Sequence, residues 1–151
     1  MRKIYLAGRY EWKEELKVIR DQVHSTNHQV ISSWIDTEEP AFGDYVIWAD
    51  KYATTDLTDI SQCDTLILFL TNPMTGELSN GGRGGHLFEF GISYATGKDI
   101  YIVGAKNSHC IFAFLNKHGL TRFDYWSECL EQLKSKRLSG IEQSIFEKAR
   151  G

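Results

Sequence analysis

Proline and cysteine are scarce in this chain of 151 residues, which contains 2 prolines and 3 cysteines. The low proline content and a charged fraction of 25% argue against a disordered or collagen-like chain. Cys63, Cys110 and Cys129 are odd in number and lack CxxC spacing, so we expect buried free thiols in a reducing compartment. Neither the cysteines nor the histidines have metal-ligand spacing. The sequence therefore predicts no metal and no cofactor.

Long apolar stretches and a large net charge are also absent. The apolar run Ile4 to Ala7 is too short for a signal peptide, and no stretch of 18 apolar residues occurs. The chain has 17 Lys and Arg against 20 Asp and Glu, a net charge of −3, so a nucleic acid polymer or a membrane is not a predicted partner. We expect a cytoplasmic protein with one domain over residues 1–151.

Short apolar segments alternate with helical patterns along the chain. Because they are nearly continuous runs, these segments predict strands that are covered on both faces, as in parallel sheets. The sequence therefore predicts an α/β fold with a single doubly wound, mostly parallel five-stranded sheet. The expected strands are Lys3 to Ala7, Val30 to Trp34, Thr65 to Leu70, Ile100 to Val103 and Arg122 to Trp126.

Helices are expected between the strands. Apolar residues at helical spacing predict a helix from about Tyr10 to His24, and a stripe predicts a second helix before the third strand. A third helix should begin near Gly85 and stop at Gly97, and helical pattern returns at 128–136 and 141–148. We expect the tail after Arg137 to be peripheral or to reach another subunit. The stripe of the second helix consists of Val46, Ala49, Ala53, Leu57 and Ile60.

The connection after the third strand is the most unusual segment of the sequence. It runs from Thr71 to Gly85 and holds four glycines around Arg83. Ligands bind at the carboxyl ends of parallel strands, and glycine amides with an Arg at a helix N-terminus suit an anion. A flexible loop is an equal alternative. Glu89, between apolar neighbours, is either a favourable acid near a helix N-terminus or a desolvated group suited to chemistry.

Three separated segments resemble the nucleoside 2-deoxyribosyltransferase family and the related nucleotide N-glycoside hydrolases. They are the strand Lys3 to Gly8, the pair Asp56-Leu57 followed by Asp64, and the stretch Gly82 to Lys98 with Glu89 inside it. Order and approximate spacing also agree over about two thirds of the chain. Many relatives have the sequence GRGGR in the loop, whereas His86 stands here where the second Arg would be.

The resemblance implies a flavodoxin-like fold and roles for individual residues. It makes Glu89 the nucleophile, Tyr5 the hydroxyl that orients Glu89, and Asp56 the group that passes a proton to the base. The implied partner is a small-molecule nucleoside or nucleotide, and a homodimer or larger homo-oligomer is expected because relatives complete their pocket with a neighbouring chain. Substrate binding is expected at Gly8, Arg83, Gly84, Gly85 and His86.

The implied reaction cleaves an N-glycosidic bond and transfers the deoxyribosyl group to another base. Hydrolysis of a nucleoside 5′-monophosphate and a non-catalytic nucleotide-binding module remain alternatives. Trp34 and Trp48 are candidates for stacking on the base, although packing is the commoner use of Trp. Asp56 falls late in its predicted helix, which places it far from the strand ends unless that helix starts only near Trp48.

Overall fold

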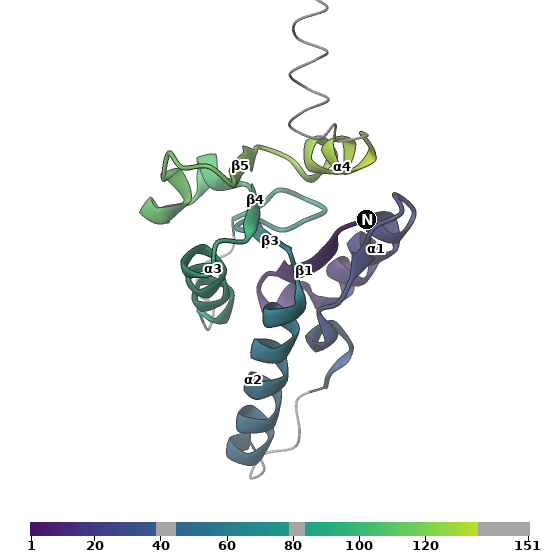
Figure 1. Ribbon diagram of the computed structural model, residues 1–151, viewed down its shortest axis with the longest axis vertical. Helices are drawn as coiled ribbons and strands as arrows, with labels where there is room; N and C mark the ends of the chain where they lie inside the picture. The colour runs from purple at the N-terminus through teal and green to yellow at the C-terminus, as the bar shows by residue number, and fades with distance from the viewer. Residues whose placement is uncertain (39–44, 79–83, 136–151) are drawn as a thin grey trace, which may run out of the picture.

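The computed structural model describes residues 1–38, 45–78 and 84–135 (Figure 1). Its five strands form one sheet in the order β2-β1-β3-β4-β5, and every neighbouring pair is parallel. This order is that of a flavodoxin-like sheet, so the predicted α/β fold is confirmed. The strands are β1 (Lys3–Ala7), β2 (Gln29–Val30), β3 (Thr65–Phe69), β4 (Asp99–Val103) and β5 (Leu120–Phe123).

Helices cover both faces of the sheet, with α1 packed near α4 and α2 near α3 (Figure 1). None of the helices in the described ranges is long and apolar enough to cross a membrane. The α-helices are α1 (Lys13–His24), α2 (Tyr45–Gln62), α3 (Gly85–Ala95) and α4 (Trp126–Lys134). Shorter 3-10 turns are η1 (Tyr10–Trp12), η2 (Ser33–Asp36), η3 (Ala105–Asn107) and η4 (Ile111–Phe114).

The core lies around the three central strands. Every residue of β3 is buried, as are four of the five residues in β1 and in β4. Helix α1 covers one face with Leu16, Ile19 and Val23, the spacing that the sequence predicts. Gly97, with φ of 75°, follows α3 in the left-handed conformation expected of it. The free thiols of Cys63 and Cys129 are buried, whereas Cys110 is half-buried.

The second strand is shorter than the predicted Val30 to Trp34, because side chains replace backbone partners along β1. Ile31 still donates its N–H to the Ile4 carbonyl at 2.9 Å. One step further, the Leu6 N–H donates to Ser32 Oγ at 3.1 Å, and the Trp34 Nε1–H donates to the Leu6 carbonyl at 2.8 Å. With both backbone groups of Leu6 satisfied by side chains, the chain turns into η2.

The fifth strand also differs from its prediction. It begins at Leu120 and ends at Phe123, two to three residues before the predicted segment, because Tyr125 and Trp126 already belong to the start of α4. The Tyr125 N–H donates to Glu128 Oε1 at 3.1 Å, and Trp126 packs on Phe69. Trp126 therefore belongs to α4, and its apolar side chain packs on Phe69 of β3. The helical pattern at 141–148 lies outside the described residues.

Helix α2 exists where the stripe predicts a helix, but most of the residues of this stripe are not buried. Val46 is 80% exposed and Leu57 is 44% exposed, whereas Ile60 is buried. The face turned toward the protein instead carries Tyr52 and Asp56, which are half-buried. Most of α2 borders a cavity and not the core, so its apolar residues do not mark the packed side.

Candidate active site

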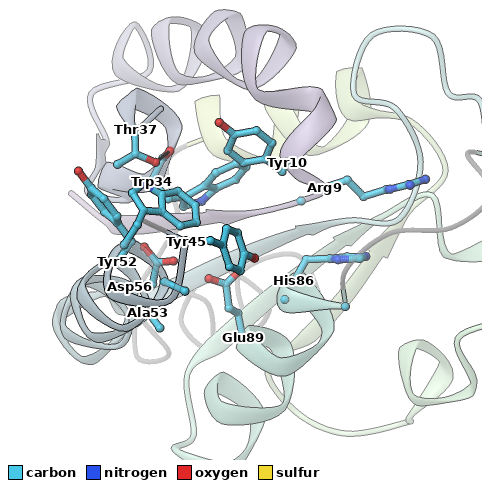
Figure 2. Close-up of a pocket in the computed structure, with 15 residues that line it drawn as sticks. Arg9, Tyr10, Trp34, Thr37, Tyr45, Tyr52, Ala53, Asp56, His86 and Glu89 are labelled. Carbon is cyan, nitrogen blue, oxygen red and sulfur yellow. Dashed lines mark hydrogen bonds between the residues drawn. The ribbon is translucent and has the colours of Figure 1, made fainter. Parts of the chain in front are cut away.

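A cavity of about 270 Å³ opens at the carboxyl end of β1 (Figure 2). Gly8 and Arg9 follow β1, Trp34 comes from η2, and the remaining walls come from α2 and the start of α3. This is the edge where parallel sheets place their ligands. Gly8 packs closely against α1, since a Cβ on it would lie 3.1 Å from Leu16 Cδ1.

Tyr5 and Glu89 are joined by a hydrogen bond at the base of the cavity. The Tyr5 side chain is fully buried in β1, and its hydroxyl donates to Glu89 Oε2 on α3. Burial, with the negative charges of Glu89 and Asp56, raises the pKa of Tyr5 well above its usual value, so Tyr5 stays a donor. Burial also raises the pKa of Glu89 to about 8, although the Tyr5 hydrogen bond opposes that shift.

Asp56 directs its carboxyl group into the same cavity from α2 (Figure 2). Burial raises its pKa to about 7, and the nearby charge of Asp59 adds to the effect. Asp56 Oδ1 is buried, and among the described residues no group forms a hydrogen bond with it. A buried acceptor of this kind is costly unless a ligand or a proton satisfies it.

The length of α2 explains how Asp56 reaches the site. The 18 residues of α2 extend over about 27 Å, whereas the five residues of β1 extend over about 17 Å. Helix α2 therefore projects past the carboxyl end of the sheet, as Figure 1 shows, and Asp56, although late in α2, lines the cavity together with Gly8 and Glu89. The alternative start near Trp48 is wrong, because Tyr45 is already helical.

Aromatic side chains form one end of the cavity. Tyr45, Trp48 and Tyr52 follow one another on α2 with ring centroids 5.5 and 5.2 Å apart, and Trp34 and Tyr10 face them. Trp34 and Trp48 are predicted from the sequence as candidates for stacking on a base, whereas the three tyrosines are not. The spacing of three and four between the α2 aromatics is a helical stripe that the apolar pattern concealed.

Cationic and amide groups form the other end. Arg9 and His86 lie on the side of the cavity away from Trp34 and Tyr52 (Figure 2). Arg9 is 7% exposed, and burial together with the Arg9 charge lowers the pKa of His86. Gly84, with φ of 79°, and Gly85 stand at the start of α3 and line the cavity. The first N–H groups of a helix have no partner within the helix and are available to a ligand at its N-terminus. Arg83 lies outside the described residues, and Arg9 was not predicted.

The site residues do not suit a metal ion. Among the described residues no three His, Cys, Asp or Glu side chains are grouped so that they can hold one.

The fold is similar to that of solved enzyme structures. The 2-deoxyribosyltransferase of Bacillus psychrosaccharolyticus matches 91% of this chain over 99% of its own, with a TM-score of 0.58 and 21% identity. The CMP N-glycosidase of Clostridium botulinum matches 87% of this chain over 98% of its own, with a TM-score of 0.53 and 21% identity. At this identity the likeness establishes a shared fold. No protein-family model and no curated protein sequence matches the chain.

Proposed function

We propose that this protein cleaves the N-glycosidic bond of a nucleoside or nucleotide and transfers the sugar to another base. The observation that carries the proposal is a buried pair of carboxyl groups, Glu89 and Asp56, that share one cavity with an aromatic end. One solved neighbour of the fold is a 2-deoxyribosyltransferase and the other a CMP N-glycosidase. Both of these activities break a bond of this kind.

In the first step Glu89 acts as the nucleophile. Its carboxylate oxygen attacks C1′ of the sugar and forms an ester, while the bond from C1′ to the base nitrogen breaks with its electron pair going to the base. Asp56 in its acid form gives its proton to the departing base, which therefore leaves as a neutral molecule. Tyr5 holds Glu89 by its hydrogen bond, which fixes the direction of attack.

In the second step the reaction runs in reverse with a new nucleophile. An acceptor base loses its proton to the Asp56 carboxylate and attacks C1′, and the ester bond to Glu89 breaks. Each displacement inverts the configuration at C1′, so the two displacements in sequence retain it, as in retaining glycosidases. If water attacks in place of the base, the same two residues perform hydrolysis.

The two ends of the cavity suggest how a substrate is oriented. Trp34 and Tyr52 offer ring faces to a nucleobase, next to Asp56, which has to reach that base. Glu89 lies between this aromatic end and Arg9 (Figure 2). The sugar is therefore expected over Glu89, with its 5′ side toward Arg9.

Hydrolysis of a nucleoside 5′-monophosphate is the second candidate function. It is favoured by the buried Arg9 beside His86 and the first amides of α3, since a phosphate suits a guanidinium group and a helix N-terminus. Comparing kcat/KM for a deoxynucleoside and its 5′-monophosphate, in the native protein and in Arg9→Gln, tests it. A phosphate preference that the variant loses supports the nucleotide substrate, and equal values in both proteins contradict it.

We also propose that the active form is a homo-oligomer. Helix α3 carries no Lys, Arg or Asp, and Leu87 and Phe88 on it are 41% and 63% exposed. Phe112 and Phe114 of η4 are exposed as well, and an apolar cavity lies between the two elements. Contiguous apolar patches of this kind are unusual on monomers. Light scattering after gel filtration is expected to give at least a dimer, and a monomeric mass contradicts the proposal.

Product analysis tests the main proposal. The protein is incubated with a deoxynucleoside, or its 5′-monophosphate, with and without a free acceptor base, and products are separated by chromatography. A new nucleoside supports transfer, and free sugar or sugar phosphate supports hydrolysis. Binding of these compounds without any base release would contradict both reactions and favour a nucleotide-binding module.

A further inference from the structure

Asp59 occupies an unusual place on α2 for a carboxylate. Its Oδ2 atom accepts two hydrogen bonds from one residue of η2, from the Ser33 N–H at 2.9 Å and from the Ser33 hydroxyl at 2.6 Å. The side chain of Asp59 is half-buried. A charged acceptor with two donors is a strong fastening point between a helix and a neighbouring turn.

The turn that Asp59 binds is itself fixed to β1. Ser32, next to Ser33, accepts the Leu6 N–H on its hydroxyl oxygen at 3.1 Å. Trp34, on the other side of Ser33, donates its Nε1–H to the Leu6 carbonyl at 2.8 Å. Because Leu6 follows Tyr5 in β1, the Asp59 contact connects α2 to the strand that carries Tyr5.

Asp59 is also the next residue after Asp56 on the same side of α2. A spacing of three residues places two side chains on one helix face about one turn apart. The Asp59 carboxyl group therefore lies beside that of Asp56, and the two hydrogen bonds from Ser33 fix its position. The titratable or charged groups that line the same cavity as Asp56 or act on it electrostatically are Asp59, Tyr45 and Tyr52 on α2, Tyr5 on β1, Glu89 and His86 on α3, and Arg9 and Tyr10 after β1.

We propose that Asp59 is a positioning residue that fastens α2 to η2 through Ser33 and places its negative charge one helical turn from Asp56. This inference rests on the proposed function, because that function makes Asp56 the acid that protonates the base. A fixed carboxylate beside Asp56 favours the protonated form of that residue, as like charges do. The hydrogen bond from Tyr5 favours the ionised form of Glu89, which the nucleophilic step requires.

The Asp59 inference can be tested without any turnover. Aspartate side-chain carboxyl groups are labelled with ¹³C in the full chain, and their NMR signals are followed against pH. The Asp56 signal is identified by its loss in Asp56→Asn. In Asp59→Asn, which keeps an oxygen for Ser33 but removes the charge, the Asp56 midpoint is expected to fall by about half a pH unit or more.

Two further variants make the NMR test specific. Asp36→Asn is the matched control, because Asp36 is an exposed carboxylate paired with Arg20 at 2.8 Å and should leave the Asp56 midpoint unchanged. Asp59→Glu restores the charge and is expected to restore most of the shift. If the circular dichroism spectrum shows that Asp59→Asn is not folded, Asp59→Ser serves as a second uncharged variant.

The possible results separate the two proposals. An Asp56 midpoint that is the same in the native protein, Asp59→Asn and Asp59→Ser overturns the role of Asp59. A midpoint that falls equally in Asp36→Asn also overturns it, since any loss of charge would then suffice. If the midpoint falls only in the Asp59 variants but the native protein releases no base, the Asp59 role stands and the proposed function fails.

Discussion

The two ends of the sheet carry acidic residues in opposite situations. At the amino end, Arg2 Nη1 donates to Thr65 Oγ1 at 2.7 Å and to Asp99 Oδ2 at 2.9 Å. Asp64 accepts the Lys3 N–H at 3.0 Å and the Thr65 hydroxyl at 2.7 Å. At this end donors and acceptors satisfy one another, and the network connects β1, β3 and β4.

At the carboxyl end the carboxyl groups have far fewer partners. Glu89 accepts a hydrogen bond from Tyr5, and Asp56 Oδ1 has no hydrogen-bond partner among the described residues. Burial raises the pKa of both groups, to about 8 and about 7. A satisfied network stabilises a fold, whereas buried acids that lack donors destabilise it and are suited to ligand binding and proton transfer.

Glu89→Ala is expected to have the largest effect. Removing the nucleophile should lower kcat/KM for base release by about a thousandfold or more, because the covalent step is lost. Glu77→Ala is the matched control, since Glu77 is exposed in the connection after β3. Steady-state rates and circular dichroism spectra of both variants check this. A folded Glu89→Ala protein with native activity would contradict the assignment.

Asp56→Asn and Asp64→Asn test the comparison of the two ends directly. Loss of the acid in Asp56→Asn should lower kcat about 100-fold to 10,000-fold, and less for a substrate whose base leaves without a proton. Asp64→Asn should leave kcat within about threefold of native, since Asp64 bonds Lys3 and Thr65 at the far end. Equal losses in the two variants would remove the distinction between the ends.

The pH dependence of kcat/KM is expected to be a bell. Glu89 and Asp56 share a cavity and titrate as a pair, with pKa values of about 7 and about 8. Below pH 7 both are protonated and no nucleophile exists, and above pH 8 both are ionised and no acid remains. The optimum should therefore lie between these values. A profile that stays flat from pH 6 to pH 9 would contradict the pair.

Arg2→Ala should have the smallest effect on catalysis and a visible effect on stability. The variant removes the two hydrogen bonds that Arg2 donates to Thr65 and Asp99, which should lower the free energy of unfolding by about 1 kcal/mol. For a chain of this size that corresponds to a fall in Tm of about 2 to 4 °C. Thermal unfolding and kcat are measured together. A changed kcat with an unchanged Tm would contradict this prediction, because Arg2 would then act in catalysis and not in stability.

The central architecture could be predicted from the sequence because its strands are buried on both faces. Continuous apolar runs locate β1, β3 and β4 closely. The prediction was wrong where side chains determine the backbone path. Ser32 and Trp34 end β2 early through bonds to Leu6, and no periodicity contains that information.

The candidate site could be predicted in part. The resemblance named Tyr5, Asp56 and Glu89, and the fold brings these three residues together. Of the apolar stripe of α2 only Ile60 is buried, because this helix borders a cavity lined by tyrosines and by Asp56. Arg9 was missed, since a single Arg after a strand has no pattern. Its burial depends on tertiary contacts such as the one with the Trp12 ring, whose centroid lies 5.6 Å from the guanidinium carbon.

The most direct test of the covalent mechanism is to trap the sugar on Glu89. A nucleoside with fluorine at C2′ slows the breakdown of a glycosyl ester, because the oxocarbenium-like transition state is destabilised. After incubation and digestion, mass spectrometry is predicted to find the fluorinated sugar on the peptide that contains Glu89, and not in Glu89→Ala. Release of the base with the sugar attached to Asp56, or to no residue, would contradict the account.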